Sequence, residues 1–305
     1  MAPSIQKYLN QYFSASNSTI RFHSIGGGCI NDCFQITVNS EKFFLKINSA
    51  GKHPNLFEKE KNGLELLGSQ NIIRIPKPIF CDEVEDKQIL LLEWIETGSR
   101  TQQFWKTFGE QLARLHHITW SHRPRLRKTF GGRRDGQTMF GLDEDNYMGS
   151  LPQKNEPHSN WNKFFIDCRL QPQIKLAEQK HLLLKKHLAA FENIYSKLPE
   201  IFNEEKPSLL HGDLWSGNFM CDENSQPVLI DPAVYYGHRS MDLAMTTLFG
   251  GFDKAFYDSY NYHFPFPSNY YEQWNVANLY PLLIHLNLFG SGYLAQIESI
   301  LSSFH

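Results

Sequence analysis

Hydrophobic positions in the first hundred residues follow a helical pattern at first and strand-like runs afterwards. Residues 4–13 repeat apolar positions with helical spacing, which predicts a short amphipathic helix. Three short runs that are rich in β-branched and aromatic residues follow. They predict strands at residues 19–25, 33–38 and 43–47. The polar residues 39–41 predict a hairpin turn between the last two strands.

A second helical pattern and two further apolar runs complete this part of the chain. Residues 55–68 have helical periodicity, with Pro54 suited to the first turn and Gly68 to the end of the helix. Residues 76–96 predict two strands around an acidic turn. The order of three strands, a helix and two strands is typical of the small lobe of a kinase, and we place this lobe at residues 1–96.

The remaining chain, residues 97–305, is predicted to form a mainly helical lobe. Helical patterns occupy residues 103–118, 161–197, 238–249, 252–262 and 270–303. The pattern at 161–197 divides near Pro172, and residues 119–160 predict a long, functional loop region. The predicted fold class is therefore α+β, a two-lobed protein-kinase-like fold with a β-rich N-lobe, which contains a five-stranded sheet, and a mainly helical C-lobe.

Two adjacent histidines, His116 and His117, end the helical pattern at 103–118. Because adjacent residues cannot share one helix face, a metal-binding pair is not expected. Core packing or compensation of the helix dipole is the better interpretation.

Composition is that of an ordinary globular protein. The 305 residues are 41% hydrophobic and 20% charged, which allows two lobes and a sizeable core. The formal net charge of -2 provides no global positive field, so a nucleic-acid partner is not expected.

Membrane insertion and secretion are not expected either. The N-terminal residues lack the apolar run of a signal peptide, and the apolar stretch from Leu279 is too short and too polar to span a bilayer. The five cysteines include no C-x-x-C pair. We therefore expect a cytoplasmic protein with reduced thiols.

The chemically richest stretch is 210–231, LHGDLWSGNFMCDENSQPVLID. Its His211, Asp213 and Asn218 have the H-x-D-x-x-x-x-N spacing of a kinase catalytic loop, and Asp231 follows a short apolar run. This layout suits phosphoryl transfer from ATP. Asp213 would accept the proton of the attacking hydroxyl, while Asn218 and Asp231 would hold Mg²⁺. The alternative is that these are ordinary turn residues.

Three features of the predicted N-lobe suit nucleotide binding. Glycines in the first turn allow backbone amides to approach a phosphate. They are Gly26, Gly27 and Gly28. Lys46 lies inside the third strand, where Glu60 of the following helix could hold it against the α- and β-phosphates. The alternatives are a solvated Lys46 and a pairing with Glu58, from which Glu60 differs only in register.

The segment that joins the two predicted lobes is the candidate adenine site. Glu93, Trp94 and Ile95 follow a buried apolar strand, and their backbone could hydrogen-bond the edge of adenine. An ordinary exit from a strand is the alternative.

With these residues in place, a family resemblance is specific and covers nearly the whole chain. HGDLWSGN together with DPAVYYGHRSMDLAMTTLFGGF closely resembles the fructosamine kinase (ketosamine-3-kinase) family. The segments GGGCIN, FGLDEDNYMGSLPQKN and WNKFFIDCRLQPQI are similar to that family as well. The fold implied is that of aminoglycoside and choline phosphotransferases, which are relatives of protein kinases.

The resemblance implies an activity and assigns residues to it. The activity is ATP-dependent phosphorylation of the third hydroxyl of a sugar attached to an amine, a ketosamine such as fructosamine or ribulosamine. Phosphorylation makes the adduct labile, so a deglycation repair role follows. By position, Asp213 matches the proton acceptor, and Asn218 and Asp231 match the magnesium ligands. In the nucleotide site, Lys46 matches the family's phosphate-binding lysine and Glu60 matches its partner. The segment that contacts adenine is matched by Glu93, Trp94 and Ile95. Trp215 either stacks on the sugar or buttresses the loop.

One departure from the family pattern is visible, and one feature argues against a protein kinase. Ser240 stands where the family usually has glutamate, and it could cap a helix that begins near Met241. Asp242 is expected to brace the catalytic loop. Gly212 replaces the arginine of H-R-D, and no A-P-E follows Asp231, so a phosphorylated activation loop is not expected.

Alternatives and partners stay open at this point. The chain could be a phosphotransferase for an aminoglycoside or choline, or a non-catalytic nucleotide-binding module. The acceptor could be a small-molecule or a protein-bound ketosamine. Cys29 lies directly after the glycines, where phosphate-binding amides would favour a thiolate. It is a candidate redox switch, and the chain could be a monomer or a disulfide-linked homodimer through Cys29.

Overall fold

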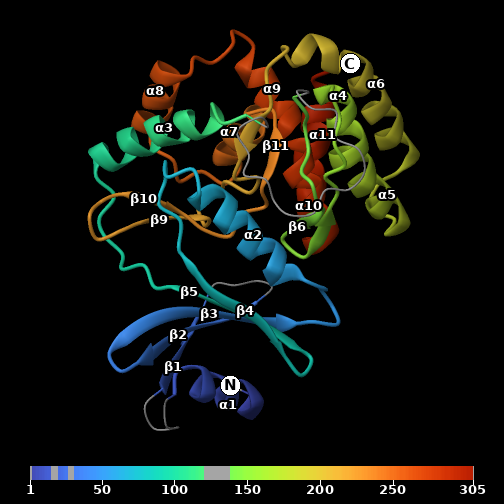
Figure 1. Cartoon of the computed structure of the whole chain (residues 1–305). Coiled ribbons are helices and arrows are strands. Elements are labelled where there is room, and N and C mark those ends of the chain that lie inside the picture. Colours follow the sequence, from blue (N-terminus) through green and yellow to red (C-terminus); the bar gives the residue numbers. More distant parts are fainter. Residues whose placement is uncertain (1, 15–19, 27–30, 120–137, 305) are drawn as a thin grey trace. The chain divides into compact units, whose positions relative to one another are not determined.

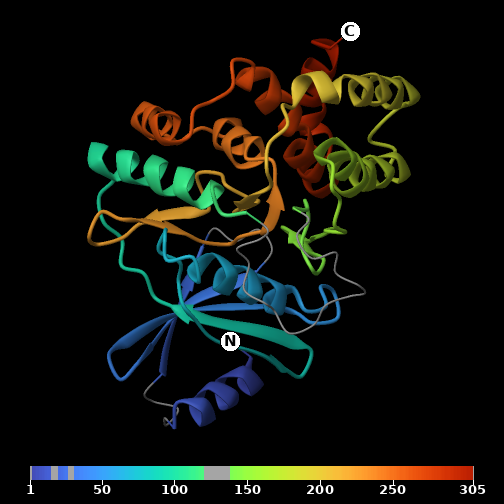
Figure 2. The same cartoon turned by 45° about the horizontal axis from the view of Figure 1, so that its top comes forward.

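The computed structural model describes residues 2–14, 20–26, 31–119 and 138–304 (Figures 1 and 2). The chain forms two compact units. The first comprises Met1–Arg100 and Met220–Asp231, and the second comprises Thr101–Phe219 and Pro232–His305. The sequence-based boundary between residues 96 and 97 stays a prediction.

The first unit is built on a five-stranded antiparallel sheet. Along the chain its elements are α1 (Pro3–Tyr12), β1 (Ile20–Ile25), β2 (Asp32–Val38), β3 (Glu41–Ser49), α2 (Leu56–Gly68), β4 (Pro78–Val84) and β5 (Lys87–Glu93). The strands lie in the order β1-β2-β3-β5-β4. Asn39 and Ser40, which join β2 to β3, both have positive φ angles, as a tight two-residue hairpin requires. The predicted helices, strands and hairpin are confirmed, but Pro54 lies outside α2, which begins at Leu56 after the N-cap Asn55.

Strand alternation gives the two faces of this sheet different roles. Leu45 and Ile47 of β3 belong to an apolar cluster that also contains Ile5 and Leu9 of α1. Lys46 lies between them in the strand, so its side chain points to the opposite face. Figures 1 and 2 show α2 on that opposite side of the sheet from α1. The sheet therefore presents Lys46 to α2, and it is buried, with 2% of its surface exposed.

A short hairpin from the middle of the chain joins this unit. It consists of β9 (Phe219–Cys221) and β10 (Pro227–Leu229). The backbone N–H of Leu229 donates to the carbonyl of Arg74 at 3.0 Å, and the N–H of Gly98 donates to the carbonyl of Cys221 at 2.9 Å. These contacts attach the hairpin, which leads directly to Asp231, to the segment before β4 and to the segment after β5.

The second unit is mainly helical, as predicted. Its long helices are α3 (Gln102–His116), α5 (Gln171–Gln179), α6 (Lys185–Ile201), α7 (Ser240–Leu248), α8 (Lys254–His263), α9 (Tyr270–Ala277), α10 (Leu279–Phe289) and α11 (Leu294–Ser302). Two short strands, β8 (Ser208–Leu210) and β11 (Tyr235–Gly237), pair with each other. A second hairpin, β6 (Asn146–Met148) and β7 (Leu151–Gln153), lies in the region that the sequence predicted as a loop.

The predicted break near Pro172 is wrong. The helix α4 (Trp161–Phe164) continues through a π-helical segment, Phe165–Leu170, directly into α5, and the chain leaves the helix only after Gln179. Pro172 lies in the first turn of α5 and cannot donate to the carbonyl of Cys168, four residues earlier. That carbonyl accepts a hydrogen bond from Nη1 of Arg169 at 3.0 Å instead. The side-chain donor lets the helix pass through the proline.

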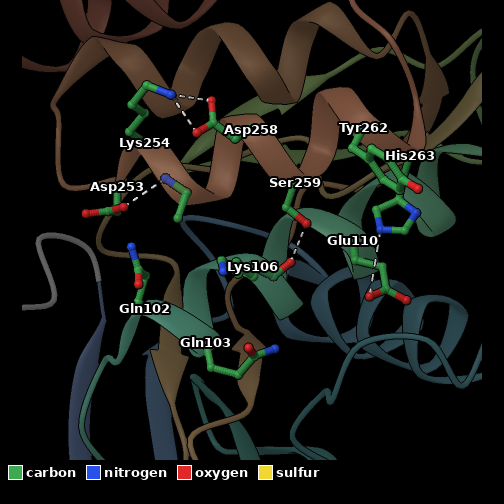
Figure 3. Close-up of a pocket in the computed structure, with 11 residues that line it drawn as sticks. Gln102, Gln103, Lys106, Glu110, Asp253, Lys254, Asp258, Ser259, Tyr262 and His263 are labelled. Atoms are coloured by element: carbon green, nitrogen blue, oxygen red, sulfur yellow. Dashed lines mark hydrogen bonds and ion pairs between the residues drawn. The ribbon is translucent and has the colours of Figure 1, made fainter.

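Two helices of the second unit, α3 and α8, pack closely along their lengths. A Cβ on Gly109 of α3 would lie 2.2 Å from the carbonyl oxygen of Phe256 in α8, so only glycine allows this approach. Oγ of Ser259 donates to the carbonyl of Lys106 at 2.7 Å, a contact that Figure 3 shows. The relative position of α3 and α8 is thereby fixed.

The length and polarity of the helices decide whether any of them could span a membrane. Within the described part of the chain, every helix is too short or too polar to cross a lipid bilayer.

Candidate active site

The predicted catalytic loop follows β8 and begins at His211. Gly212 has a φ of +84°, and a Cβ at this position would lie 2.0 Å from the carbonyl oxygen of Ala233. Both facts require glycine, because other residues disfavour this conformation and the approach leaves no room for a side chain. The absence of the arginine found in H-R-D therefore has a local structural cause.

Asp213 and Asn218, predicted as base and metal ligand, are brought together by this loop. Nδ2 of Asn218 donates to Oδ2 of Asp213 and to the backbone carbonyl of Asp213, both at 2.9 Å. Asn218 is 6% exposed. With its amide nitrogen turned toward Asp213, the amide oxygen of Asn218 is the atom that can ligate a cation.

Asp242 braces the loop from α7, as the sequence predicts. Its Oδ2 accepts a hydrogen bond from the backbone N–H of His211, and its Oδ1 accepts one from the N–H of Gly212, both at 2.8 Å. Asp242 is 1% exposed. A buried carboxylate needs such donors, so the loop and α7 stabilise each other.

The first unit brings Lys46, Glu60 and Asp231 together. Nζ of Lys46 lies 2.7 and 2.8 Å from the two carboxylate oxygens of Glu60 and 3.1 Å from Oδ1 of Asp231. Glu58, the alternative partner, is exposed. Burial alone would lower the pKa of Lys46, but the carboxylates of Asp231 and Glu60 raise it above its ordinary value. Lys46 is therefore a fixed cation at neutral pH.

Glu60 and Asp231 differ in their surroundings. Burial raises the pKa of Glu60, and the Lys46 ammonium opposes this shift. The side chain of Asp231 keeps 46% of its surface exposed. Its φ of +54° lies in the left-handed region, which aspartate and asparagine tolerate better than most residues. Asp231 therefore has an accessible carboxylate on a constrained backbone.

The predicted adenine segment is held by hydrogen bonds and an ion pair. The backbone N–H of Glu93 donates to the carbonyl of Lys77 at 2.9 Å. The carboxylate of Glu93 binds Nη2 of Arg74 at 2.8 Å, and Nη1 of the same guanidinium binds Asp222 at 2.6 Å. Ile95 is buried. The side chain and the N–H of Glu93 are therefore both engaged within the first unit.

The glycine turn lies only partly within the described residues. Gly26 ends the described part after β1, and a Cβ there would meet nothing within 4 Å. Gly27, Gly28 and Cys29 lie outside the described residues. The roles predicted for these three positions stay predictions.

Trp215 lies in the catalytic loop with 37% of its surface exposed. Its ring covers Gly217, where a Cβ would lie 2.4 Å from the indole. The ring centroid lies 5.8 Å from that of Phe249, in an edge-to-face arrangement. Phe249 in turn lies 4.9 Å from His285 of α10. The contact with Gly217 is that of a buttress, and the exposed part of the ring can also meet a ligand.

Phe249 and His285 were not among the residues that the sequence singled out. Phe249 is 39% exposed, and Nδ1 of His285 lies 2.7 Å from the carbonyl of Pro281. Burial lowers the pKa of His285.

The predicted N-cap role of Ser240 is wrong. Helix α7 already begins at Ser240, and its N-cap is Arg239 in a helical conformation. Oγ of Ser240 instead lies 2.8 Å from Nδ1 of His238, and Ser240 is 2% exposed. The hydroxyl is occupied by the neighbouring imidazole and is unavailable to cap the helix.

A cavity of about 530 Å³ lies between α3 and α8 (Figure 3). Its walls carry charged side chains that are exposed to solvent, such as Lys254 and Asp258, which pair at 2.6 Å. None of the predicted site residues lines it.

Replacing Gly212 with alanine is expected to lower the free energy of unfolding by about 1–3 kcal/mol, the cost of a strained backbone. The Cβ would also push Ala233 away and disturb the loop. Chemical denaturation measures the effect. Gly292→Ala is the matched control, because a Cβ there meets nothing within 4 Å. Equal stability of the two variants would contradict this account of Gly212.

The chain is similar to known proteins over nearly its whole length. The model of the family described as fructosamine kinase matches residues 1–304. A probable ketoamine kinase from Synechocystis is 35% identical over 91% of this chain and 88% of that protein. The chloroplastic protein-ribulosamine 3-kinase of Arabidopsis thaliana is 36% identical over 92% of this chain and 81% of its own length. Mouse ketosamine-3-kinase is 31% identical, with 95% and 96% covered.

Solved structures resemble the chain over its whole length. A candidate fructosamine-3-kinase from Thermobifida fusca superposes with a TM-score of 0.84 at 26% identity, covering 100% of this chain and 99% of that one. Aminoglycoside phosphotransferase APH(4)-Ia, in its complex with ADP and hygromycin B, has a TM-score of 0.64 at 14% identity, with 98% of each chain covered. This second likeness shows the fold alone. The predicted two-lobed kinase-like fold class is confirmed.

Proposed function

The chain belongs to the fructosamine kinase family, and on that premise we propose that it transfers the γ-phosphate of ATP to the third hydroxyl of the sugar in a ketosamine. Fructosamines and ribulosamines are the acceptor class. The observation that carries this proposal is the match along residues 1–304, in a chain whose catalytic loop holds Asp213 and Asn218 in hydrogen-bond contact. Such phosphorylation makes the sugar adduct labile, which fits a deglycation role.

Asp213 is the proposed proton acceptor for the attacking hydroxyl. Positioning and charge stabilisation supply most of the catalysis in phosphoryl transfer, so the base must be held in one orientation. The hydrogen bonds from Asn218 to Asp213 at 2.9 Å and from the loop backbone to Asp242 at 2.8 Å supply this orientation. Asp242 is thus a positioning residue.

Lys46 is proposed to bind the α- and β-phosphates, with Glu60 holding it in place. The two contacts of 2.7 and 2.8 Å with Glu60 fix the ammonium, and its raised pKa keeps it charged. Gly26, Gly27 and Gly28 would add backbone amides, and the segment from Glu93 to Ile95 would contact adenine through its backbone.

Asn218 and Asp231 fit a magnesium ion by their chemistry. One offers an amide oxygen and the other an accessible carboxylate, and oxygen is the ligand that Mg²⁺ prefers. Within the described residues, no three or more His, Cys, Asp or Glu side chains come together to hold a metal. Two protein ligands suit an ion that arrives with a nucleotide and takes its other ligands from phosphates and water. When bound, Mg²⁺ would neutralise phosphate charge.

Trp215 is proposed to contact the sugar, with Phe249 beside it. Both side chains are more than one third exposed, and they lie edge to face within the second unit. An indole face suits the C–H groups of a sugar ring or a protonated amine. Trp215 lies within the catalytic loop itself, two residues after Asp213.

Substrate choice tests the proposal. We expect ADP formation from ATP with fructosyl-lysine or ribulosyl-lysine to exceed that with choline or kanamycin by at least ~10-fold in kcat/KM, because a site that hydrogen-bonds one acceptor rejects another. A coupled ADP assay measures all four. Turnover of kanamycin or choline at the ketosamine rate would contradict the acceptor class. ATP binding without turnover of any acceptor would indicate a nucleotide-binding module.

A further inference from the structure

One guanidinium connects two parts of the first unit that would meet a nucleotide. Arg74 lies before β4, and its Nη2 lies 2.8 Å from Oε1 of Glu93, the first residue of the candidate adenine segment. Its Nη1 lies 2.6 Å from Oδ2 of Asp222, directly after β9 in the hairpin that leads to Asp231. We propose that Arg74 is a positioning residue for nucleotide binding, which holds the adenine segment and the Asp231 hairpin in a fixed relation.

The backbone of Arg74 makes a second connection to the same hairpin. Its carbonyl accepts a hydrogen bond from the N–H of Leu229 at 3.0 Å, and Arg74 pairs with Val228 of β10 as a parallel bridge. Because β9 and β10 have three residues each, the hairpin depends on such outside contacts for its stability. The main chain of Arg74 therefore holds β10, two residues before Asp231, while its side chain reaches the turn after β9.

The carboxylate that Arg74 binds on the hairpin is buried. Asp222 is 2% exposed. Its Oδ1 accepts hydrogen bonds from the backbone N–H groups of Asn224 at 2.9 Å and Gln226 at 2.8 Å, which shape the turn. Burial would raise the pKa of Asp222, but the N–H of Gln226 and the Arg74 guanidinium lower it below its ordinary value. Asp222 is therefore an anion at neutral pH, and a buried anion requires a partner.

The Arg74 guanidinium also keeps like charges together. Besides Glu93 and Asp222, a third carboxylate oxygen, Oε1 of Glu223, lies 3.6 Å from Nη1. Exposed ion pairs contribute little by themselves, but a planar guanidinium holds two carboxylates in fixed directions. Without it, Glu93 and Asp222 would repel each other, and we expect the adenine segment to move away from the hairpin.

The consequence falls on nucleotide recognition. The proposed adenine contacts depend on the backbone of Glu93 to Ile95, and the proposed magnesium contact depends on Asp231. Loss of Arg74 should therefore weaken MgATP binding. It should also reduce the preference for ATP over GTP, because a displaced backbone no longer distinguishes the two bases by hydrogen bonds. The inference rests on the proposed function for its nucleotide only, since nucleotide affinity is measured without an acceptor.

Two substitutions at Arg74 test its charge and its shape separately. We expect Arg74→Met to raise the Kd for MgATP about tenfold, the effect of a lost charged hydrogen bond, and to lower the ratio of ATP to GTP affinity at least ~3-fold. Arg74→Lys should stay at least ~3-fold weaker than wild type, because a single ammonium cannot hold both carboxylates. Calorimetric titration measures each value. Arg21→Met, at an exposed arginine of β1, is the matched control and should keep both wild-type values.

Two further variants separate the two branches of the contact. Glu93→Gln removes the charge on the adenine segment and should lower the ratio of ATP to GTP affinity more than the affinity for magnesium. Asp222→Asn keeps an oxygen for the turn amides, and it should raise the magnesium concentration needed for half-maximal ATP binding. The double variant Arg74→Met/Glu93→Gln should bind MgATP more tightly than Arg74→Met, because the repulsion between the two carboxylates is relieved.

Several results would overturn the proposal. One is wild-type affinity and base preference in folded Arg74→Met, and another is an equal loss of ATP and GTP affinity in that variant. If Arg74→Met does not fold, Arg74→Lys and Glu93→Gln decide, and wild-type values in both would reject it. If wild type binds MgATP but phosphorylates no ketosamine, the proposed acceptor fails by itself, and the same titrations still test Arg74. A wild type that binds no MgATP would reject both.

Discussion

Asp213→Asn is expected to lower kcat by at least ~10²-fold, the usual contribution of a general base, while MgATP binding stays near normal. Asparagine keeps the shape of the side chain and an oxygen that can accept the hydrogen bond from Asn218. The loop should therefore keep its conformation, and only proton acceptance is lost. Steady-state turnover of a ketosamine, together with calorimetric titration of MgATP, separates the two effects.

Asp258→Asn is the matched control for this substitution. Asp258 lies on the exposed face of α8, where it pairs with Lys254 at 2.6 Å, and it has no part in the catalytic loop. Its replacement changes the same functional group and should leave kcat unchanged. Near-normal turnover by purified Asp213→Asn would remove Asp213 from the mechanism.

Asp231→Asn is expected to weaken MgATP binding by at least ~10-fold, because a metal ligand acts on the ground-state complex as well as on the transition state. Binding of ATP in the presence of a chelator should change little. Asparagine is the better test than alanine, since Asp231 has a φ of +54° and alanine would add backbone strain. Titration of both nucleotide forms measures the difference.

The control for Asp231 addresses its ion pair with Lys46. Asp231→Asn also removes a carboxylate 3.1 Å from Nζ of Lys46. Glu60→Gln removes the other carboxylate of this group and should weaken ATP binding with and without magnesium. If Asp231→Asn binds MgATP like wild type, the metal-ligand assignment is wrong. If Asp231→Asn loses affinity for ATP equally with and without magnesium, the effect comes from the lost ion pair with Lys46.

The first unit could be predicted from the sequence because local patterns determine it. Alternating runs in β2 and β3 put Lys46 on the face opposite Leu45 and Ile47, and helical spacing in α2 put Glu60 within reach. The choice between Glu58 and Glu60 needed the structure. Successive side chains of an α-helix point about 100° apart around its axis. The sequence does not show how the helix is rotated over the sheet, and therefore which glutamate faces Lys46.

The catalytic loop could be predicted as a motif, and Asp242 as its brace, but not the reasons for their geometry. The need for glycine at position 212 comes from the carbonyl of Ala233, which is distant in sequence. The Asp242 contacts with His211 and Gly212 span about thirty residues. His116 was expected to pack in the core, which it does, but its two hydrogen-bond partners lie more than a hundred residues away.

Other features were missed because they depend on tertiary contacts. The strands β6 and β7 have three residues each, too few for a periodic signal, and they lie among turn-forming residues. The helix passes Pro172 because Arg169 satisfies the carbonyl that a proline leaves without a donor. Serine is a favoured N-cap residue, but the hydroxyl of Ser240 is hydrogen-bonded to the imidazole of His238 instead. At Pro172 and at Ser240, a side-chain partner overrides the local propensity.

The position of the new phosphate tests the central claim most directly. Wild-type protein, ATP with magnesium and ribulosyl-lysine are incubated, and the product is examined by a phosphorus–proton correlation spectrum. The account predicts one new phosphate coupled to the proton on the third sugar carbon, followed by slow release of free lysine after the protein is removed. A phosphate coupled to the terminal carbon of the sugar, or no sugar phosphate at all, would contradict it.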